Sequence, residues 1–250
     1  LPVREKAIYD NSLRYAGQGR YLKAYLGDNF DYIVKTNLDD EPSQKKRIRV
    51  EWIGNGYEYT ARQRLNGIAV PTLIIDSSNG KKENFVYRLE GKGLIKTDLA
   101  IIQEKIIPLL EHLKILARSG QKPKARKSID EYKKLTLLMF RRGVVDMDFG
   151  GTIANYGINQ RTGEMCIFDF GDLTSGISQA YEFTDGIDGV NTFIADGIRS
   201  TVDADLADYF GKNGFKEEDF IAAGEYLFGV DLKGKDLSKF AMAFALSEKK

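Results

Sequence analysis

The feature that most constrains the fold of this chain is a change of sequence pattern close to Leu99. Before that point, short runs rich in Tyr, Leu and Val alternate with glycine-containing turns, which is typical of antiparallel strands. After it, apolar residues recur at the spacing of a helix over longer stretches. A run of strands followed by a run of helices predicts an α+β fold with two lobes.

The first lobe is expected over residues 1–91 as a small antiparallel sheet with one main helix. Tight turns at Gly17–Gly19 and Gly27–Asn29 are predicted to join the first three strands into a meander. The helix is predicted over residues 57–65, and an Asn79-Gly80 turn should join the last two strands. The strands themselves are expected over residues 12–16, 20–26, 30–36, 72–76 and 84–89.

The second lobe is expected over residues 92–250 and is mostly helical. Apolar residues at helical spacing predict a long helix over residues 99–117, which Pro108 should kink. Ser128 and Glu131 form a capping-box pattern that should start a second helix ending near Arg142. Short strands over residues 144–145, 156–158 and 165–168 are then followed by helices to the end of the chain.

The tract between these two predicted helices is rich in positive charge. We interpret it as an exposed linker rather than a binding patch, because it surrounds Pro123 and contains small and polar residues. Its cationic residues are Arg118, Lys122, Lys124, Arg126 and Lys127.

Composition excludes several kinds of site. The chain has one cysteine, Cys166, and one histidine, His112. A disulfide framework, a multi-cysteine zinc site and a histidine-rich metal centre are therefore excluded, and a Ser-His-Asp triad is disfavoured. We interpret Cys166 as a buried small hydrophobic residue and His112 as a structural or solvent-facing helical residue.

No apolar run approaches the roughly 20 residues of a membrane span, so we expect a cytoplasmic protein without a membrane partner. The chain begins at Leu1 rather than Met, which is consistent with removal of an upstream segment.

The formal net charge of +1 hides an uneven distribution. Residues 1–142 carry 28 Lys and Arg against 17 Asp and Glu, whereas residues 143–250 carry 9 against 19. A total near zero argues against nucleic acid as a partner. The uneven distribution is compatible with a charged cleft between the lobes, or with two solvated faces of opposite sign.

The segment most suggestive of chemistry is the apolar strand that leads into Asp169-Phe170-Gly171. An earlier apolar strand ends in Asp146 and Asp148. Asn155 begins a further short strand, which lies in the sequence between Asp148 and the strand that leads to Asp169. Carboxylates and an amide are thus expected at the ends of adjacent short strands. Their oxygens suit Mg²⁺, which usually also keeps waters and phosphate oxygens. A further carboxylate could accept the proton of an attacking hydroxyl, so the pattern favours phosphoryl transfer.

Residues 229–236 read Gly-x-x-x-x-Gly-Lys-Asp, which is close to a P-loop. Asp236 stands where a P-loop needs Ser or Thr to hold Mg²⁺, and the preceding segment resembles a helix rather than a strand. We therefore do not expect a nucleotide there.

Taken in order, the motifs of residues 12–172 resemble the protein-kinase-like fold, and most closely its small-molecule branch, the aminoglycoside phosphotransferases. Gly17 and Gly19 resemble the glycine-rich loop, and Lys35, which ends the run Tyr-Ile-Val-Lys, resembles the phosphate-binding lysine. Glu58 resembles the helix glutamate that pairs with that lysine. The segment Phe85–Gly91 resembles the hinge whose backbone binds adenine, which implies nucleotide-binding roles for Arg88, Leu89, Glu90 and Gly91.

The same resemblance implies ATP and Mg²⁺ as cofactors and a hydroxyl of a small molecule or protein as the acceptor. Asn155 and Asp169 would be metal ligands, and Asp148 would be the catalytic base. Asp146 stands where the family usually has histidine, and Asn155 follows Asp148 by seven residues rather than five. The base therefore remains open between Asp146 and Asp148.

The missing histidine, the longer catalytic loop and the incomplete glycine motif keep other functions open. Leu22 replaces the third glycine, and no Ala-Pro-Glu follows Asp169, which argues against a standard peptide-binding shelf. One alternative is an inactive pseudokinase that acts as a binding or scaffold module. Another is a kinase-fold enzyme that transfers a nucleotidyl group.

Overall fold

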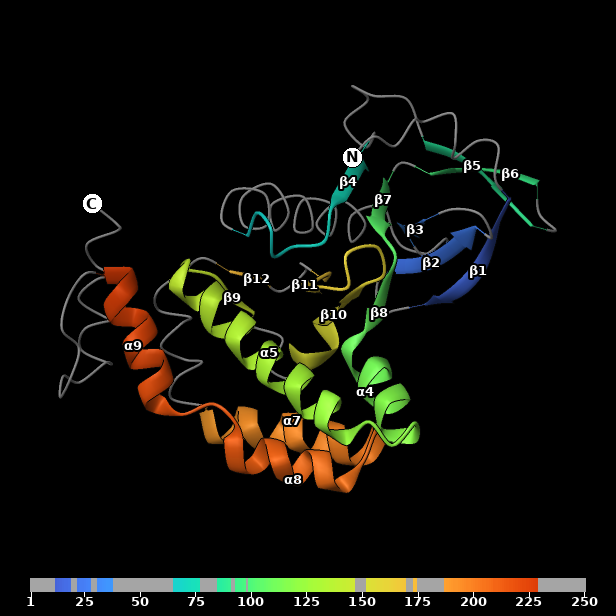
Figure 1. The fold of residues 1–250 in the computed structure, drawn as a ribbon. Coiled ribbons are helices and arrows are strands. Elements are labelled where there is room, and N and C mark those ends of the chain that lie inside the picture. Colours follow the sequence, from blue (N-terminus) through green and yellow to red (C-terminus); the bar gives the residue numbers. More distant parts are fainter. Residues whose placement is uncertain are drawn as a thin grey trace. The chain divides into compact units, whose positions relative to one another are not determined.

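The computed structural model of this chain has an α+β fold, with strands in the N-terminal part and helices in the C-terminal part (Figure 1). It describes residues 12–18, 22–27, 31–37, 65–76, 85–90, 93–97, 99–146, 152–169, 173–174 and 187–228.

The chain forms two compact units. The first comprises residues 1–55, 70–106 and 159–162, and the second comprises residues 56–69, 107–158 and 163–250. The chain therefore passes between the units more than once, and residues 92–106 group with the sheet of the first unit. The division into a nucleotide-binding lobe over residues 1–91 and a catalytic lobe over residues 92–250 stays a prediction.

The first unit is built on a seven-stranded sheet in the order β4-β7-β3-β2-β1-β5-β6. The strands β1 to β3 form the predicted antiparallel meander, with Tyr15 opposite Tyr25 and Ala24 opposite Lys35. The strands are β1 (Ser12–Gln18), β2 (Leu22–Gly27), β3 (Tyr32–Asn37), β4 (Thr72–Asp76), β5 (Phe85–Leu89), β6 (Gly93–Thr97) and β7 (Leu99–Glu104).

The prediction of a helix over residues 99–117 is wrong for its first part. Residues Leu99–Glu104 form β7, which lies between β3 and β4 and is buried along its whole length. A strand that is buried on both faces shows a continuous apolar run, and periodicity alone does not distinguish such a run from a buried helix.

The predicted hairpin between the strands over residues 72–76 and 84–89 is also wrong. The strand β4 pairs with β7, whereas β5 pairs with β1 and with β6. The two strands thus lie on opposite sides of the sheet order, and the Asn79-Gly80 turn lies outside the described residues. An Asn-Gly pair favours a tight turn, but it does not decide which strands pair across the sheet.

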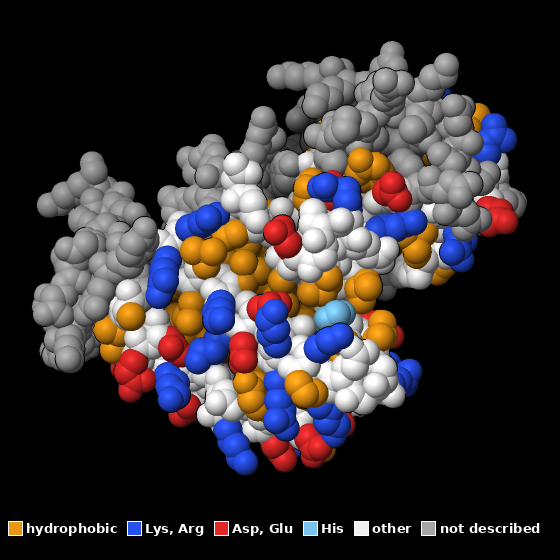
Figure 2. Space-filling view, viewed as in Figure 1, with side chains coloured by type: hydrophobic (Ala, Val, Ile, Leu, Met, Phe, Trp, Pro, Cys, Tyr) orange, Lys and Arg blue, Asp and Glu red, His pale blue; other side chains and the backbone are white. Residues whose placement is uncertain are grey.

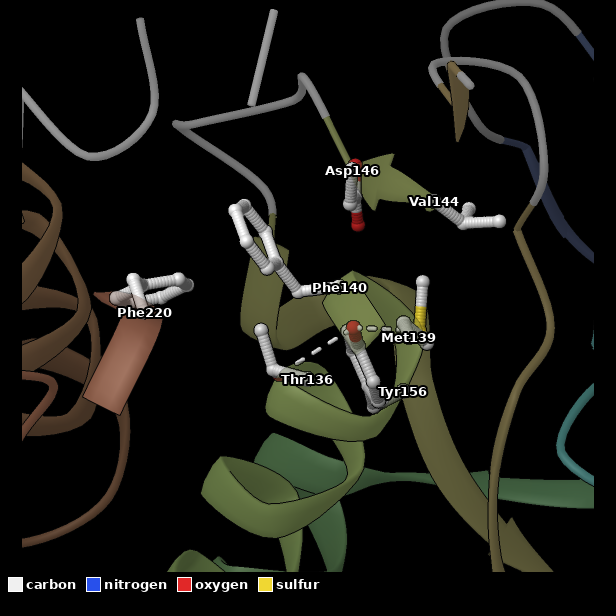
Figure 3. Close-up of a pocket in the computed structure, with 7 residues that line it drawn as sticks. All are labelled: Thr136, Met139, Phe140, Val144, Asp146, Tyr156 and Phe220. Atoms are coloured by element: carbon white, nitrogen blue, oxygen red, sulfur yellow. Dashed lines mark hydrogen bonds between the residues drawn. The ribbon is translucent and has the colours of Figure 1, made fainter. Parts of the chain in front are cut away.

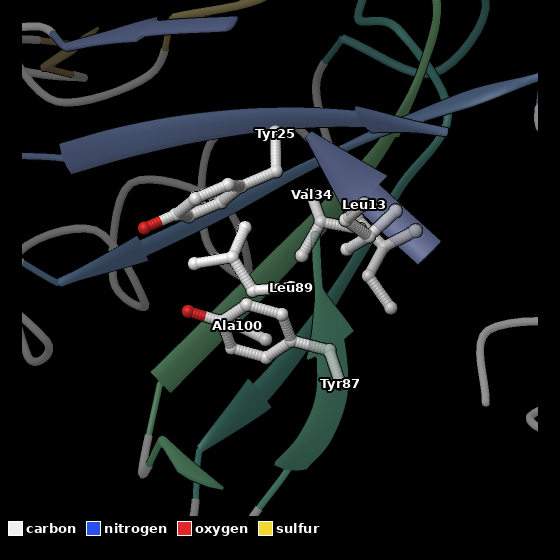
Figure 4. Packing of buried hydrophobic residues seen from close by; sticks show 7 residues of the cluster. Leu13, Tyr25, Val34, Tyr87, Leu89 and Ala100 are labelled. Atoms are coloured by element: carbon white, nitrogen blue, oxygen red, sulfur yellow. The ribbon is translucent and has the colours of Figure 1, made fainter. Parts of the chain in front are cut away.

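One face of the sheet carries the main core of the first unit (Figure 4). The rings of Tyr25 and Tyr87 have centroids 5.4 Å apart and lie beside the buried side chain of Leu89. Strand alternation places these side chains on the same face, and their burial removes apolar area from water. The buried residues of the cluster are Leu13, Tyr25, Val34, Tyr87, Leu89, Ala100 and Ile102.

The second unit is mainly helical, and its C-terminal helices are orange to red in Figure 1. Its helices are α4 (Leu109–Arg118), α5 (Lys122–Arg141), η2 (Thr152–Asn155), α7 (Ile187–Thr201), α8 (Ala204–Asn213) and α9 (Glu217–Phe228). A three-stranded sheet has the order β11 (Met165–Ile167), β10 (Tyr156–Asn159), β8 (Ile106–Pro108). A separate pair is formed by β9 (Val145–Asp146) and β12 (Leu173–Thr174).

The helix α5 begins at Lys122 and not at Ser128, so the capping-box prediction is wrong. Pro123 lies in the first turn of α5, where its missing N–H costs no hydrogen bond. Ser128 is buried within the helix, and its hydroxyl lies 3.3 Å from Nε2 of His112. The connection from α4 is only Ser119–Gln121, with Gly120 at φ +73, a conformation that favours glycine.

The basic tract is therefore mostly helical rather than a linker. Lys122 pairs with Asp203 at 3.3 Å and also contacts Asp205, which ties α5 to the start of α8. Lys133, farther along α5, pairs with Asp219 of α9 at 2.8 Å. In Figure 2, Lys and Arg side chains gather over α5, with Asp and Glu side chains towards α8 and α9.

Among the described residues, no helix combines the length and the apolar character needed to cross a membrane.

Candidate functional site

The candidate site is built around Asp146, the last residue of β9. Its backbone is held by β12, because Leu173 lies opposite Asp146 in the antiparallel pair. The Asp146 side chain is deeply buried, with a relative exposure of 3% for the residue. A carboxylate that is buried this deeply requires polar partners, because an unpaired buried charge is costly.

Asn155 supplies such a partner. It ends the 3-10 helix η2 and directly precedes β10. Its Nδ2 donates a hydrogen bond of 3.0 Å to a carboxylate oxygen of Asp146, and Asn155 itself is buried. The structure thus brings together two of the predicted site residues, which are nine positions apart in the sequence.

The backbone of Asn155 also holds the segment that leads to Asp169. Strands β10 and β11 pair antiparallel, with Tyr156 opposite Ile167. Just beyond this pair, the backbone N–H of Phe168 donates to the carbonyl oxygen of Asn155 at 2.9 Å. Asp169 is the next residue along, and its side chain is exposed. Asn155 is therefore connected to Asp146 through its side chain and to the Asp169 segment through its backbone.

A small, mainly apolar pocket lies beside Asp146 (Figure 3). One carboxylate oxygen of Asp146 points toward the side chains of Met139 and Tyr156. The Tyr156 hydroxyl accepts a hydrogen bond from Thr136 at 3.3 Å and donates to Sδ of Met139 at 3.1 Å. The pocket is lined by Thr136, Met139, Phe140, Val144, Asp146, Tyr156 and Phe220.

The electrostatics of this pocket oppose further negative charge. Burial, and secondarily the nearby Asp146 carboxylate, raise the pKa of Tyr156 well above its ordinary value. Tyr156 therefore remains a neutral hydroxyl at neutral pH.

Amide and carboxylate oxygens, which the predicted metal ligands carry, are the donor type that a hard divalent cation prefers. Among the described residues, no group of three His, Cys, Asp or Glu side chains could hold a metal ion by itself. The residues predicted to hold a metal, Asn155 and Asp169, would supply one amide oxygen and one carboxylate. Mg²⁺ is bound in this way, through one or two protein oxygens together with phosphates and water.

Of the residues predicted to contact phosphates, Gly17 and Lys35 lie in the described part of the first unit. Gly17 follows a shift in the pairing register of β1 with β2, and a Cβ at this position would meet nothing within 4 Å. Lys35 lies on β3, opposite Ala24 on one side and Ile101 on the other, and is half-buried. The predicted residues Gly19, Glu58, Gly91 and Asp148 lie outside the described residues.

The predicted adenine-binding segment begins on β5. Leu89 is buried in the core of the first unit, whereas Arg88 and Glu90 are exposed. The backbone N–H of Glu90 donates to the carbonyl oxygen of Leu13 at 2.9 Å, so this donor is already used within the sheet.

A second buried polar group was missed by the sequence analysis. Glu104, at the end of β7, accepts hydrogen bonds from Asn159 at 2.7 Å and from two nitrogens of Arg161 at 3.0 Å each. These contacts hold the turn after β10 against the end of β7. No local sequence pattern predicts these hydrogen bonds, because Asn159 and Arg161 are more than fifty residues from Glu104 in the sequence.

Comparison with known proteins finds similarity only among solved structures. No protein-family model matches the chain, and no curated protein matches it. The ROP18 kinase domain, solved with AMP-PNP and sucrose, has a TM-score of 0.47 at 13% identity, covering 92% of this chain and 81% of that chain.

Two further solved structures are similar. ROP2 from Toxoplasma gondii, described as a virulence factor with a protein-kinase fold and no enzymatic activity, has a TM-score of 0.41 at 11% identity, covering 93% of this chain and 80% of that chain. A microcompartment-associated aminopropanol kinase has a TM-score of 0.30 at 11% identity, covering 98% and 96%. The chain is thus similar, at low sequence identity, to solved structures of kinases and of the protein-kinase fold.

Proposed function

We propose that this protein is an ATP- and Mg²⁺-dependent phosphotransferase that transfers the γ-phosphate to a hydroxyl of a small molecule or protein. The observation that carries the proposal is the connection from Asp146 to Asn155 and on to the Asp169 segment. It ties a buried carboxylate and an amide to the backbone that leads to an exposed carboxylate. Phosphoryl transfer needs little covalent chemistry from the protein and depends on positioning and electrostatic stabilisation, which such a rigid set of oxygens can supply.

In this proposal Asn155 and Asp169 hold Mg²⁺, which when bound neutralises charge that develops on the phosphoryl oxygens. Lys35 contacts the phosphates of the nucleotide, with Glu58 as its partner. The turn at Gly17–Gly19 covers the phosphates, because glycines allow the backbone to approach them closely. Arg88–Gly91 stays the predicted adenine-binding segment, and it must use backbone groups other than the N–H of Glu90.

Asp148 is the proposed base that orients the acceptor hydroxyl and takes its proton, with Asp146 as the alternative. Burial of Asp146 and its bond to Asn155 favour Asp148 for this role, since a base must reach the proton that it abstracts.

The nucleotide site is tested by thermal unfolding with ATP and Mg²⁺. At a hundredfold excess over Kd, we expect the melting temperature to rise by about 5–10 °C. The Asp169→Ala variant should lose this shift, because it removes a charged metal ligand. Asp188→Asn, at an exposed position of α7, is the matched control and should keep the shift. A wild-type protein that responds to no nucleotide would contradict the proposal.

Turnover is tested with Asp148→Asn. We expect this variant to lose turnover by orders of magnitude while the thermal shift with ATP survives, because the base acts on the acceptor rather than on the nucleotide. Mass spectrometry of the products separates the reaction classes, since a phosphate and an AMP adduct differ in mass. An Asp148→Asn variant with full turnover would contradict the assigned base.

A second candidate is a pseudokinase that binds or scaffolds without transferring phosphate. It is favoured by the buried carboxylate of Asp146 at the position where the related family has histidine. Nucleotide binding without any transferred group would support this candidate.

A further inference from the structure

We infer that Asp146 is a positioning residue, which fixes the orientation of the Asn155 amide so that the amide oxygen faces the metal position. This inference rests on the proposed function, in which Asn155 is a metal ligand. It assigns Asp146 a role through Asn155 and not the role of catalytic base.

The chemistry of the hydrogen bond between Asn155 and Asp146 fixes which end of the amide faces Asp146. An ionised carboxylate only accepts hydrogen bonds, and a primary amide donates only through its nitrogen. Nδ2 of Asn155 lies 3.0 Å from the carboxylate of Asp146, so the NH2 group must be the end that faces Asp146. The carbonyl oxygen of a planar amide then points away from Asp146. Without a carboxylate at this position, the two ends of the amide could exchange places.

Both Asp146 and Asn155 are held in place by neighbouring strands and side chains. Asp146 is held in the β9–β12 pair, and its side chain lies beside Met139, Phe140 and Tyr156 in the pocket of Figure 3. Asn155 is held at its carbonyl oxygen by the backbone N–H of Phe168 at 2.9 Å. Both partners are buried, with exposures of 3% and 9%. Side chains that are locked by packing and by second hydrogen bonds can place a ligand atom within the tolerance that a metal site requires.

The surroundings of Asp146 differ from those that a catalytic base requires. A catalytic base must reach the proton of an acceptor hydroxyl, either directly or through one water. Asp146 is instead buried, with an exposure of 3%, and its carboxylate is bonded to Asn155. Its position suits an outer partner of a metal ligand, and such partners orient the ligand and tune its affinity for the metal.

The decisive experiment compares Asp146→Asn with the wild type at varied Mg²⁺, with ATP binding measured by calorimetry and turnover by product formation. The variant keeps the shape of the side chain but no longer dictates the orientation of Asn155. We expect about tenfold more Mg²⁺ to be needed for half-maximal ATP binding, which corresponds to the loss of one charge-assisted hydrogen bond. Turnover at saturating Mg²⁺ should largely recover. Loss of turnover at every Mg²⁺ concentration, with an unchanged Mg²⁺ requirement for binding, would identify Asp146 as a base and overturn the inference.

A double-mutant cycle with Asn155→Ala tests whether Asp146 acts through Asn155. The Mg²⁺ requirement of Asp146→Asn/Asn155→Ala should equal that of Asn155→Ala alone, because the amide to be oriented is gone. If the double variant instead raises the Mg²⁺ requirement by the product of the two single effects, the inference is overturned. Thr136→Val is the matched control: it removes a hydroxyl from the same pocket but leaves the Asp146–Asn155 bond intact, and should not change the Mg²⁺ requirement.

A readout without nucleotide separates failure of this inference from failure of the proposed function. If no variant and no wild-type protein binds ATP, the proposed function fails. The inferred bond is then tested by the urea midpoints of the same four proteins. Non-additive midpoint shifts would support the bond between Asp146 and Asn155, and additive shifts would overturn it.

Discussion

At the scale of single residues, most buried polar groups of the described chain have a polar partner. Glu104 meets Asn159 and Arg161, Gln103 donates to Thr72 at 3.0 Å, and Asp146 accepts from Asn155. Within the described residues, the hydroxyl of Tyr132 is the one buried side-chain oxygen or nitrogen without a hydrogen-bond partner. A buried donor or acceptor without a partner costs free energy, so Tyr132 is the residue at which a polar atom works against stability.

We therefore expect Tyr132→Phe to leave the free energy of unfolding unchanged at pH 7, or to raise it by up to about 1 kcal/mol. The ring of Tyr132 packs edge-on against Tyr156 at 4.8 Å, and phenylalanine can keep this contact. Urea unfolding of the two proteins at neutral pH measures the difference. A loss of stability of more than about 1 kcal/mol would mean that the hydroxyl has a partner in solution.

The same residue makes stability depend on alkaline pH. Burial, and secondarily the nearby Tyr156 and Asp146, raise the pKa of Tyr132 well above its ordinary value of 10.0. The folded state keeps the proton while the unfolded state releases it above pH 10, so stability is complete below pH 10 and is lost as pH rises. In Tyr132→Phe this loss should be shallower by about 1.4 kcal/mol per pH unit. Equal slopes in a urea series across pH 10 would contradict the raised pKa.

At the scale of elements, α5 organises the second unit. Its buried face includes Ile129, Tyr132 and Phe140, and the helix contacts α4, α8 and α9. Two edge-to-face ring pairs add to the packing of α5. The ring centroids of Phe140 and Phe220 are 5.1 Å apart, and those of Tyr132 and Phe215 are 5.9 Å apart. The ion pairs of Lys122 and Lys133 lie around this core and are partly exposed to solvent. Solvent-exposed ion pairs contribute little to the free energy of unfolding.

The start of α8 combines a helix cap with one of these ion pairs. The Asp203 side chain accepts from the backbone N–H of Leu206 at 3.2 Å and also pairs with Lys122. Asp203→Ala should lower the free energy of unfolding by about 0.5–2 kcal/mol, because it removes the cap.

The matched control for this change is Asp208→Ala, also on α8. Asp208 is exposed and pairs with Arg199 at 2.7 Å, and its loss should cost about 0–1 kcal/mol. Both variants are measured by urea unfolding. An effect of Asp203→Ala no larger than that of Asp208→Ala would show that the cap adds nothing to stability.

At the scale of the whole molecule, the chain divides into a unit built on a sheet and a mainly helical unit. Some residues of the basic and acidic parts of the sequence form ion pairs with each other within the second unit. Lys122 pairs with Asp203 and Asp205, and Lys133 pairs with Asp219. The first unit contains a fully buried strand, β7, and the second contains α5, whose buried face packs against several other helices. Stability should accordingly be highest near these elements and lowest at the sheet edge.

Hydrogen exchange of the whole protein checks this distribution. We expect the slowest amides on β3 and β7 in the first unit and on α5 in the second, since these elements are flanked by buried neighbours. The edge strand β6, with exposed Leu94 and Lys96, should exchange faster by orders of magnitude. Protection of β6 equal to that of β7 would mean that another part of the protein covers this edge.

The short-range features of this protein were predictable because they depend on neighbouring residues. Glycine turns and apolar runs indicated the β1–β3 meander, and short apolar runs indicated the strands over residues 156–158 and 165–168, which are β10 and β11. The burial of Cys166 follows from its place in an apolar strand, and Cys166 is buried. The α+β class follows from the order of these local patterns.

The tertiary structure decided the features that depend on distant partners. Leu99–Glu104 becomes a strand because β3 and β4 flank it on both sides, although its apolar run is equally compatible with a buried helix. Gln103, Glu104 and Asp146 can be buried only because Thr72, Asn159 and Asn155 reach them from elsewhere in the chain. Local sequence determines which conformations a segment can adopt, whereas burial and hydrogen bonding across the fold select among them, because their free energy depends on pairs of residues that are far apart in the sequence.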